Sequence, residues 1–340
     1  MTSKIKWGVL GNATIARKCV IPAIFNSENG HIHALASQNP QKAKAIAKEY
    51  NIPHLYTQYE SVLNDQQVDA VYIPLPNHLH RQWTIRALES GKHVLCEKPL
   101  ACNAAEAIGM AQTASGKGLH LMEALMYRFH PRSKAIHRVV SRGEIGVPRL
   151  VRVSFCFHME ENVLKKKENS RLKKRGGGAL LDVGCYGVSV SRWMMGKEPE
   201  KVQAMAHYTS NGVDIHTVGI LYFQNGGLAT VEASFISSLQ QTYTIVGEGG
   251  SIELPHNAFI PWEKDATYFF HNKDEEIGRR EIIPGVDEYQ LMVEHFSEAV
   301  INGTPPLVQV EDSIKNMHVL DALAESARSG RMVAISELLI

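Results

Sequence analysis

Short apolar runs alternate with amphipathic helical stretches over the first third of the chain. Between residues 4 and 123 the apolar runs fit strands at Ile5–Leu10, 32–37, Ala70–Ile73, 94–96 and 119–122. Helical stretches fill the intervals, a rhythm typical of repeated strand–helix–strand units. The pattern therefore predicts a doubly wound parallel sheet in a first domain over residues 1–124.

Residues typical of helix starts and helix ends agree with this interpretation of the first domain. Gly30 and Gly91 stand where helix C-caps are expected, because glycine adopts the left-handed conformation without a steric penalty. Pro40 and Asn103 stand at expected helix starts.

After residue 124 the apolar and polar residues alternate with a period of two over longer segments. Strands are expected at 150–158, 202–208, 218–223, 228–235 and 243–247. Such alternation is typical of an antiparallel sheet, and the glycine-containing turns at 224–227 and 247–250 would connect its hairpins. Helices are expected at 287–302 and 311–330. Residues 125–340 are therefore predicted to form an α+β domain with a mainly antiparallel sheet.

Composition narrows the class of protein. At 340 residues and 44% hydrophobic content, the chain can fill two cores. The balance of 36 basic and 35 acidic residues gives a net charge of +1, so we expect neither nucleic acid nor a membrane as partner. No apolar run approaches the ~20 residues of a membrane span, and no signal peptide is expected. The five cysteines lack metal-binding spacing, which favours reduced thiols in a cytoplasmic protein without a metal.

A glycine turn follows the first strand. Ile5–Leu10 runs into Gly11-Asn12-Ala13-Thr14-Ile15-Ala16 and then a helix. A dinucleotide fingerprint needs this context, because the helix N-terminus offers N–H groups and a positive dipole to the pyrophosphate. The candidate cofactor ligands are Gly11, Asn12, Ala13, Thr14 and Ile15. Ala13 replaces the usual second glycine, so an ordinary strand–helix turn remains an alternative.

The end of the second strand bears on cofactor choice. An NAD enzyme normally places an acid there to hold the ribose 2′-hydroxyl, and Ser37-Gln38-Asn39 contains none. A 2′-phosphate would instead find the Ser37 hydroxyl, the Gln38 amide and Lys42. The sequence therefore favours NADP(H), with NAD(H) as the alternative.

Four further motifs occur in a characteristic order: Pro74-Leu75-Pro76-Asn77-His78-Leu79-His80, Glu97-Lys98-Pro99, Met126-Tyr127-Arg128-Phe129-His130-Pro131, and Gly176-Gly177-Gly178-Ala179-Leu180-Leu181-Asp182-Val183-Gly184-Cys185-Tyr186. In them the chain resembles the glucose-fructose oxidoreductase, inositol dehydrogenase and MocA (Gfo/Idh/MocA) family, from about Lys4 to Ile335. The resemblance implies a dinucleotide-binding Rossmann domain over residues 1–124. It implies that residues 125–340 bind substrate and mediate oligomerisation through an open-faced sheet, whose exposed face often joins subunits, giving a homodimer or homotetramer.

By this resemblance Lys98 is the catalytic lysine, Asp182 a substrate-orienting carboxylate and Tyr186 the third catalytic residue. Tyr in place of the common His resembles ketosugar 3-reductases and dihydrodiol or xylose dehydrogenases. Gln38 departs from the Arg usual in NADP-using relatives. The resemblance implies cofactor contacts from Leu75, Pro76, Asn77, His80, Glu97 and Lys98. It implies substrate contacts from Lys98, Arg128, Asn169, Arg171, Asp182 and Tyr186.

The chemistry of these residues is coherent. Hydride transfer at a carbinol carbon requires a proton to move on or off its oxygen, and the nicotinamide cannot supply it. A phenol is a poor base near neutral pH unless a cation stabilises the phenolate, so Lys98 and Tyr186 form a plausible acid–base pair. Asp182 lies four residues before Tyr186, so both would project from one helix face. Alone, each would be interpreted as a solvated or packing side chain, and the joint pattern favours catalysis.

Three features each have two interpretations. The glycines at 176–178 allow close backbone approach to a ligand or to another element of the fold. His80 either hydrogen-bonds nicotinamide or ribose, or caps its helix. The run from Lys165 to Arg175, with seven basic residues and one acid, is either a solvated loop or a cover that holds the phosphates of a sugar phosphate or nucleotide sugar.

The sequence as a whole predicts an NADP(H)-dependent oxidoreductase that transfers a hydride between nicotinamide and a sugar hydroxyl or ketone. A catalytically silent dinucleotide-binding sensor or regulator is a second possibility, because fold does not fix function. A third is a dismutating enzyme that retains its cofactor, oxidising one sugar while reducing another. Retention of Lys98, Asp182 and Tyr186 favours an enzyme.

Overall fold

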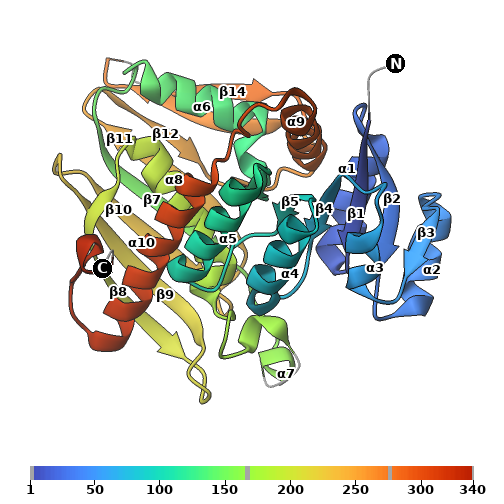
Figure 1. Cartoon of the computed structure of the whole chain (residues 1–340). Helices are drawn as coiled ribbons and strands as arrows, with labels where there is room; N and C mark the ends of the chain where they lie inside the picture. The colour runs from blue at the N-terminus through green and yellow to red at the C-terminus, as the bar shows by residue number, and fades with distance from the viewer. Residues whose placement is uncertain (1–3, 165–168, 275–277, 339–340) are drawn as a thin grey trace. The chain divides into compact units, whose positions relative to one another are not determined.

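The computed structural model describes residues 4–164, 169–274 and 278–338, and its chain divides into two compact units. The first unit comprises Met1–Phe129 and Asp287–Ile314. The second comprises His130–Val286 and Lys315–Ile340. Each unit contains one sheet, and the elements of both are labelled in Figure 1.

The first unit has a six-stranded sheet in the order β3-β2-β1-β4-β5-β6, and each pair of neighbouring strands is parallel. Its strands are β1 (Ile5–Leu10), β2 (Gly30–Ala36), β3 (His54–Tyr56), β4 (Ala70–Ile73), β5 (His93–Cys96) and β6 (Leu121–Glu123). Its helices are α1 (Ile21–Asn26), α2 (Pro40–Glu49), α3 (Tyr59–Asn64), α4 (Asn77–Glu89), α5 (Ala104–Lys117) and α9 (Glu288–Asn302). The expected doubly wound parallel sheet is confirmed, and the short β3 is an addition to it.

The predicted helix starts and ends are confirmed at three of four positions. Gly91 follows α4 with a φ of 78°, Asn39 caps the helix that begins at Pro40, and the Asn103 side chain accepts from Glu106 N. The prediction of a helix C-cap at Gly30 is wrong, because this residue opens β2. A Cβ there would lie 2.8 Å from Nε1 of Trp7, so packing explains the glycine.

Helix α9 completes the core of the first unit although it follows the second sheet in sequence. Trp7 on β1 is fully buried, its ring lies 5.5 Å from that of Phe296, and its Nε1 donates to Ser297 Oγ. The sequence interpretation placed this helix in the second domain. The division into domains at residue 124 stays a prediction.

The second unit has a nine-stranded sheet in the order β14-β13-β12-β11-β7-β10-β9-β8-β15. Its strands are β7 (Pro148–Cys156), β8 (Pro199–Tyr208), β9 (Asp214–Phe223), β10 (Leu228–Ser234), β11 (Gln240–Gly247), β12 (Gly250–Leu254), β13 (Ala266–Asn272), β14 (Arg279–Ile283) and β15 (Val333–Ala334). The β7–β10 pair is parallel and the other neighbouring strands of this sheet pair antiparallel, so the predicted mainly antiparallel sheet is confirmed.

Helices cover one face of this sheet. They include α6 (Pro131–Ser141), α8 (Cys185–Met195) and the second-unit part of α10 (Val310–Ser329), whereas α7 (Glu161–Leu164) is a single turn (Figure 1). Alternate side chains point to the opposite face, where Met205 on β8 is 81% exposed beside its partner Val218 on β9, 43% exposed. The sheet is therefore one-sided and leaves apolar side chains in solvent.

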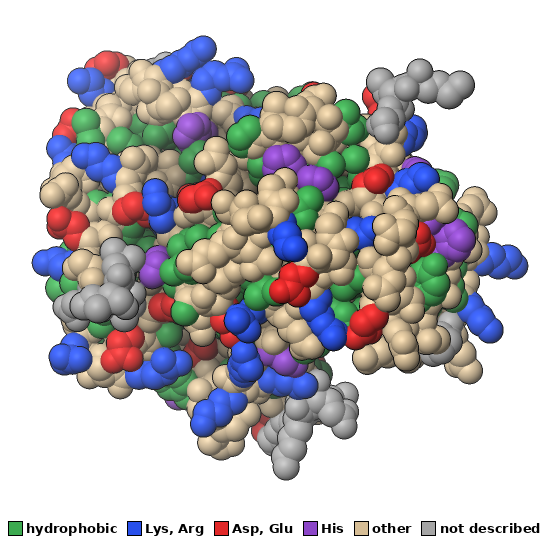
Figure 2. Space-filling view, in the orientation of Figure 1, with side chains coloured by type: hydrophobic (Ala, Val, Ile, Leu, Met, Phe, Trp, Pro, Cys, Tyr) green, Lys and Arg blue, Asp and Glu red, His purple; other side chains and the backbone are tan. Residues whose placement is uncertain are grey.

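Two properties bear on the class of partner. No helix in the described ranges combines the length and apolar character needed to cross a membrane. Figure 2 shows basic and acidic side chains interspersed over the face in view, in keeping with the net charge of +1.

Candidate active site

The glycine turn predicted to bind the pyrophosphate lies at the carboxyl end of β1. Gly11 has a φ of +114°, and a Cβ there would lie 3.1 Å from Cδ2 of Leu75, which follows β4. The helix begins at Thr14 and passes through a π-helical turn at Ala16–Val20 before α1. Within the described chain, the buried side-chain amide of Asn12 has no hydrogen-bond partner. Such orphaned donors are rare, so the turn fits a ligand that offers an acceptor, as a dinucleotide does.

Ser37 follows β2 and forms a tight turn at the start of α2. Its buried Oγ accepts from Asn39 N at 3.1 Å, while Asn39 Oδ1 accepts from Lys42 N at 3.2 Å. The side chains of Gln38 and Lys42 are exposed. The contacts of Ser37, Gln38 and Lys42 with a 2′-phosphate stay predictions.

His80 connects the loops that follow β4 and β5. It is fully buried, and its Nε2 and Nδ1 lie 2.7 Å from Leu75 O and 2.9 Å from Pro99 O. Burial lowers the pKa of His80, and its contacts with backbone carbonyls oppose this effect. A hydrogen bond from His80 to nicotinamide or ribose would have to displace one of these carbonyls. Helix α4 has no side-chain cap, so the capping interpretation is wrong.

Two buried carboxylates hold the turn that carries Lys98. Glu97 accepts from the Tyr72 hydroxyl at 2.6 Å and from Lys98 N at 3.2 Å, and Glu123 accepts from Leu100 N at 2.9 Å. Burial, and then the Glu97 carboxylate, raise the pKa of Tyr72 well above its usual range, so its phenol stays a donor. The backbone of Lys98 is thereby fixed at the carboxyl end of β5.

The remaining first-unit candidates are placed as follows. Pro76 and Asn77 are partly exposed at the start of α4, next to Leu75. Arg128 lies in a short 3-10 turn and forms an ion pair with Asp312, with Nη1 and Oδ2 3.4 Å apart. The expected contact of Arg128 with substrate stays a prediction.

In the second unit, Asp182 and Tyr186 lie on one helical segment. Asp182 belongs to a π-helical turn at Leu180–Gly184, which continues into α8 with Tyr186 as its second residue. π-Turns are rare in proteins and occur frequently at functional sites. Tyr186 is buried, and its ring lies 5.3 Å from Phe155 and 5.1 Å from Phe259.

The three glycines before this helix approach other parts of the fold. A Cβ at Gly177 would lie 2.4 Å from Lys173 O, and one at Gly178, where φ is +111°, would lie 2.0 Å from Asp214 Oδ1. The other carboxylate oxygen of Asp214 accepts from Leu180 N at 2.7 Å and from Thr217 Oγ1 at 3.0 Å. Burial raises the pKa of Asp214, and these hydrogen bonds oppose the shift. The glycines therefore let Asp214 reach the start of the helix that carries Asp182.

Arg171 is brought to Asp182. Its Nε lies 2.7 Å from Asp182 Oδ2, and its guanidinium lies 5.7 Å from the centre of the Phe157 ring. Asn169 caps the short turn that contains Arg171, and its Oδ1 accepts from Arg171 N. Arg171 therefore links Asn169 to Asp182, and the contacts of these three residues with substrate stay predictions. Residues 165–168, which supply Lys165, Lys166 and Lys167 of the basic run, lie outside the described residues.

The described residues contain no group of three or more His, Cys, Asp and Glu side chains that could hold a metal ion. The predicted absence of a metal stays a prediction.

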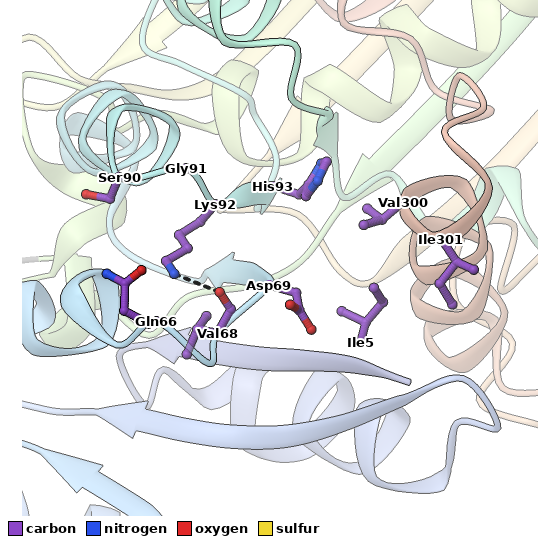
Figure 3. Close-up of a pocket in the computed structure, with 10 residues that line it drawn as sticks. All are labelled: Ile5, Gln66, Val68, Asp69, Ser90, Gly91, Lys92, His93, Val300 and Ile301. Atoms are coloured by element: carbon purple, nitrogen blue, oxygen red, sulfur yellow. Dashed lines mark hydrogen bonds between the residues drawn. The ribbon is translucent and has the colours of Figure 1, made fainter. Parts of the chain in front are cut away.

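A cavity of about 480 Å³ lies in the first unit at the amino ends of its strands (Figure 3). Ile5 and His93, which begin β1 and β5, line it, together with Asp69 before β4. Lys92 donates from Nζ to Val68 O and Asp65 O, both at 2.8 Å, and so connects the loops around the cavity. Ligands of such sheets bind at the carboxyl ends of the strands, so this cavity is not the cofactor site.

Comparison with known families decides the relationship. The model described as "Oxidoreductase family, NAD-binding Rossmann fold" matches residues 5–125, and that of the GFO/IDH/MocA C-terminal domain matches residues 133–253. The chain belongs to the GFO/IDH/MocA oxidoreductase family. The family inferred from the motifs is therefore confirmed.

Individual GFO/IDH/MocA proteins match nearly the whole chain. A D-xylose 1-dehydrogenase (NADP(+)) from Haloferax volcanii is 37% identical over 330 residues, 97% of this chain and 99% of the other. A dTDP-3,4-didehydro-2,6-dideoxy-alpha-D-glucose 3-reductase from Actinomadura kijaniata is 30% identical over 95% of this chain and 96% of its own. The crystal structure of a 3-ketoreductase from the same organism, with NADP and TDP-benzene, has a TM-score of 0.87 at 28% identity, covering 95% of this chain and 98% of the other.

The sequence did not identify three residues that support the candidate site residues within each unit. Tyr72 and Glu123 hold the Lys98 turn, and Asp214 contacts the start of the helix that carries Asp182. Tyr72 reads as an ordinary strand residue, and Asp214 lies 34 residues from Leu180. The only sequence signal for Asp214 was the run of three glycines before the helix that carries Asp182, which indicated a close approach by another group.

Proposed function

We propose that the protein is an NADP(H)-dependent oxidoreductase that transfers a hydride between nicotinamide and a hydroxyl or ketone of a sugar. The observation that carries the proposal is a match over nearly the full length to an NADP-dependent xylose dehydrogenase and to a nucleotide-sugar 3-reductase, in a chain that retains Lys98, Asp182 and Tyr186. The bound cofactor would supply or accept the hydride.

In the proposed mechanism the protein manages the proton. The Tyr186 hydroxyl gives a proton to the substrate oxygen during reduction and takes it during oxidation. The Lys98 ammonium, brought to the same oxygen, favours the phenolate by its charge and donates a hydrogen bond. Asp182 orients a neighbouring sugar hydroxyl, while its Oδ2 is held by an ion pair with Arg171 Nε at 2.7 Å.

We assign the cofactor to the carboxyl ends of β1, β2, β4 and β5. Gly11 and Asn12 would hold the pyrophosphate, together with the backbone of Ala13, Thr14 and Ile15 at the start of the helix. Ser37, Gln38 and Lys42 would hold the 2′-phosphate. Leu75, Pro76, Asn77 and Lys98 would line the nicotinamide side. Glu97 and His80 would act through the loops that they connect.

Replacement of the two proposed acid–base residues tests the mechanism. Tyr186→Phe removes one hydroxyl, so NADP(H) affinity should persist while turnover falls by about 100-fold or more. Lys98→Met should be at least as damaging, and the double variant should be little worse than the worse single one. Tyr222→Phe, on the exposed side of β9, is the matched control.

The assay follows nicotinamide absorbance with D-xylose, other free aldoses and nucleotide sugars. Near-normal turnover of Tyr186→Phe would show that the proton takes another route. NADP(H) binding without turnover on any sugar would favour the silent sensor. Retention of cofactor through gel filtration, with one sugar oxidised as another is reduced, would favour the dismutating enzyme.

We further propose that the uncovered face of the second sheet joins two or four copies of the chain in the cytoplasm. Met205 and Val218 pair on that face and are exposed in the single chain, where large apolar side chains signal an interface. Met205→Lys together with Val218→Lys should lower the mass measured by light scattering to that of one chain. An unchanged oligomer would exclude this face.

A further inference from the structure

Tyr186 lies in a cluster of aromatic side chains of the second unit. Phe259 is fully buried and stacks on Phe155, with ring centres 5.3 Å apart and planes 5° from parallel. The Tyr186 ring is tilted against both rings, by 41° to Phe155 and 44° to Phe259. Tyr243 on β11 lies 6.0 Å from Phe259 and closes the far side of the cluster. The stacked pair therefore forms a wall against which the phenol ring packs.

The segment that carries Phe259 is irregular, yet its backbone is held tightly. It connects β12 to β13 and includes Asn257, whose φ is +50°. Arg132 at the start of α6 is 1% exposed and donates from Nη2 to Asn257 O at 2.7 Å and to Ala258 O at 2.8 Å. Its Nη1 lies 3.5 Å from Thr267 O on β13.

A second residue fixes the other side of the segment. Ala258 N donates to Gln241 O at 2.8 Å, and Ile260 N donates to Gln241 Oε1 at 3.2 Å. Phe259 thus lies between two backbone positions that are each hydrogen-bonded to β11. A charged guanidinium is a costly group to bury only to fill space, and here it is used to hold carbonyl groups of one loop.

We propose that Phe259, held in place by Arg132, is a positioning residue that sets the direction of the Tyr186 hydroxyl. Proton transfer requires the donor and acceptor oxygens to lie within hydrogen-bond reach, and a displacement of about 1 Å can lower the rate by about 100-fold. A tyrosine ring is oriented through two side-chain torsions, so a wall that contacts the ring fixes its oxygen. The inference rests on the acid–base role proposed for Tyr186.

A double-mutant cycle on kcat tests the inference. Phe259→Leu removes the ring but keeps an apolar side chain, and should lower kcat by about 10-fold with KM within about twofold. In the Tyr186→Phe background the same change should have little further effect, because no phenolic hydroxyl remains to be misdirected. If Phe259→Leu fails to fold, Phe259→Met is the second variant, since methionine adapts to irregular spaces. Arg132→Lys should reproduce the effect on kcat.

Phe270→Leu is the matched control. Phe270 is a buried aromatic residue of the same sheet, 4% exposed, and its ring contacts Arg279. The control should lose stability without losing kcat. The inference fails if Phe270→Leu lowers kcat equally, if Phe259→Leu leaves kcat unchanged, or if the effect persists in full in the Tyr186→Phe background. Failure of the acid–base role of Tyr186 is a separate result, because it appears as near-normal turnover in Tyr186→Phe alone. Failure of the proposed function is separate again, because the unmodified protein would then turn over none of the sugars.

Discussion

Gly178→Ala is expected to destabilise the second unit strongly. Glycine is needed there for two separate reasons: its φ of +111° is unfavourable for other residues, and an added Cβ would lie 2.0 Å from Asp214 Oδ1. The backbone conformation costs about 1–3 kcal/mol. Moving the carboxylate away from Leu180 N removes a charge-assisted hydrogen bond of about 1.5–3 kcal/mol. The free energy of unfolding should therefore fall by about 3–5 kcal/mol.

Two other glycines separate these contributions. Gly196 ends α8 with a φ of +62° and has open space around its Cβ position, so Gly196→Ala carries only the backbone penalty, about 1 kcal/mol. Gly109 lies within α5 with open space and no positive φ, so Gly109→Ala should be neutral or stabilising by up to about 1 kcal/mol. Urea unfolding and calorimetry of each variant measure these changes in the free energy of unfolding. Equal losses for Gly178→Ala and Gly196→Ala would refute the proposed contact with Asp214.

Two further predictions concern cofactor choice and pH. Ser37→Asp should keep the turn, because a carboxylate can also accept from Asn39 N, but should repel a 2′-phosphate and move the ratio of dissociation constants toward NAD(H); an unchanged ratio in fluorescence titrations would argue against Ser37 as the 2′-site. Burial, and then Arg132, lower the pKa of His130 to about 4. The unfolded chain therefore takes up a proton between pH 6.5 and 4 that the folded chain does not. The free energy of unfolding should decrease as the pH is lowered through this window. The difference between the unfolded and folded pKa of His130 corresponds to about 3 kcal/mol. His130→Asn keeps an N-cap acceptor and has no such proton to take up, so its free energy of unfolding should decrease by about 3 kcal/mol less over the same window. Identical pH profiles of the two proteins in urea unfolding would contradict the lowered pKa of His130.

Local patterns in the sequence were enough to predict the sheet of the first unit. Strand β1, the glycine turn and the helix starts at Pro40 and Asn103 are all properties of neighbouring residues. Strand β3 was not predicted because its three residues are too few to show a periodic pattern, and all three are only half-buried. Gly30 was misassigned because its reason lies across the sheet, in the side chain of Trp7.

The catalytic candidates were accessible for a different reason. Lys98, Asp182 and Tyr186 stand in motifs that a family shares, so their identity could be predicted without their geometry. Their supports could not, because Asp214, Arg132 and Phe259 act through contacts between distant segments. Asn169 and Arg171 were predicted as substrate contacts, and the structure adds that Arg171 is paired with Asp182.

The position of α9 has a consequence for the order of events during synthesis. Trp7 leaves the ribosome well before the side chains that cover it, Phe296 and Ser297, which are made almost 300 residues later. The whole segment from His130 to Val286, including most of the second sheet, is translated in between. A nascent chain that has completed only the six parallel strands must therefore keep an indole and its surroundings uncovered. The first unit begins to form before the second sheet is made, and it cannot be finished until α9 has followed that sheet.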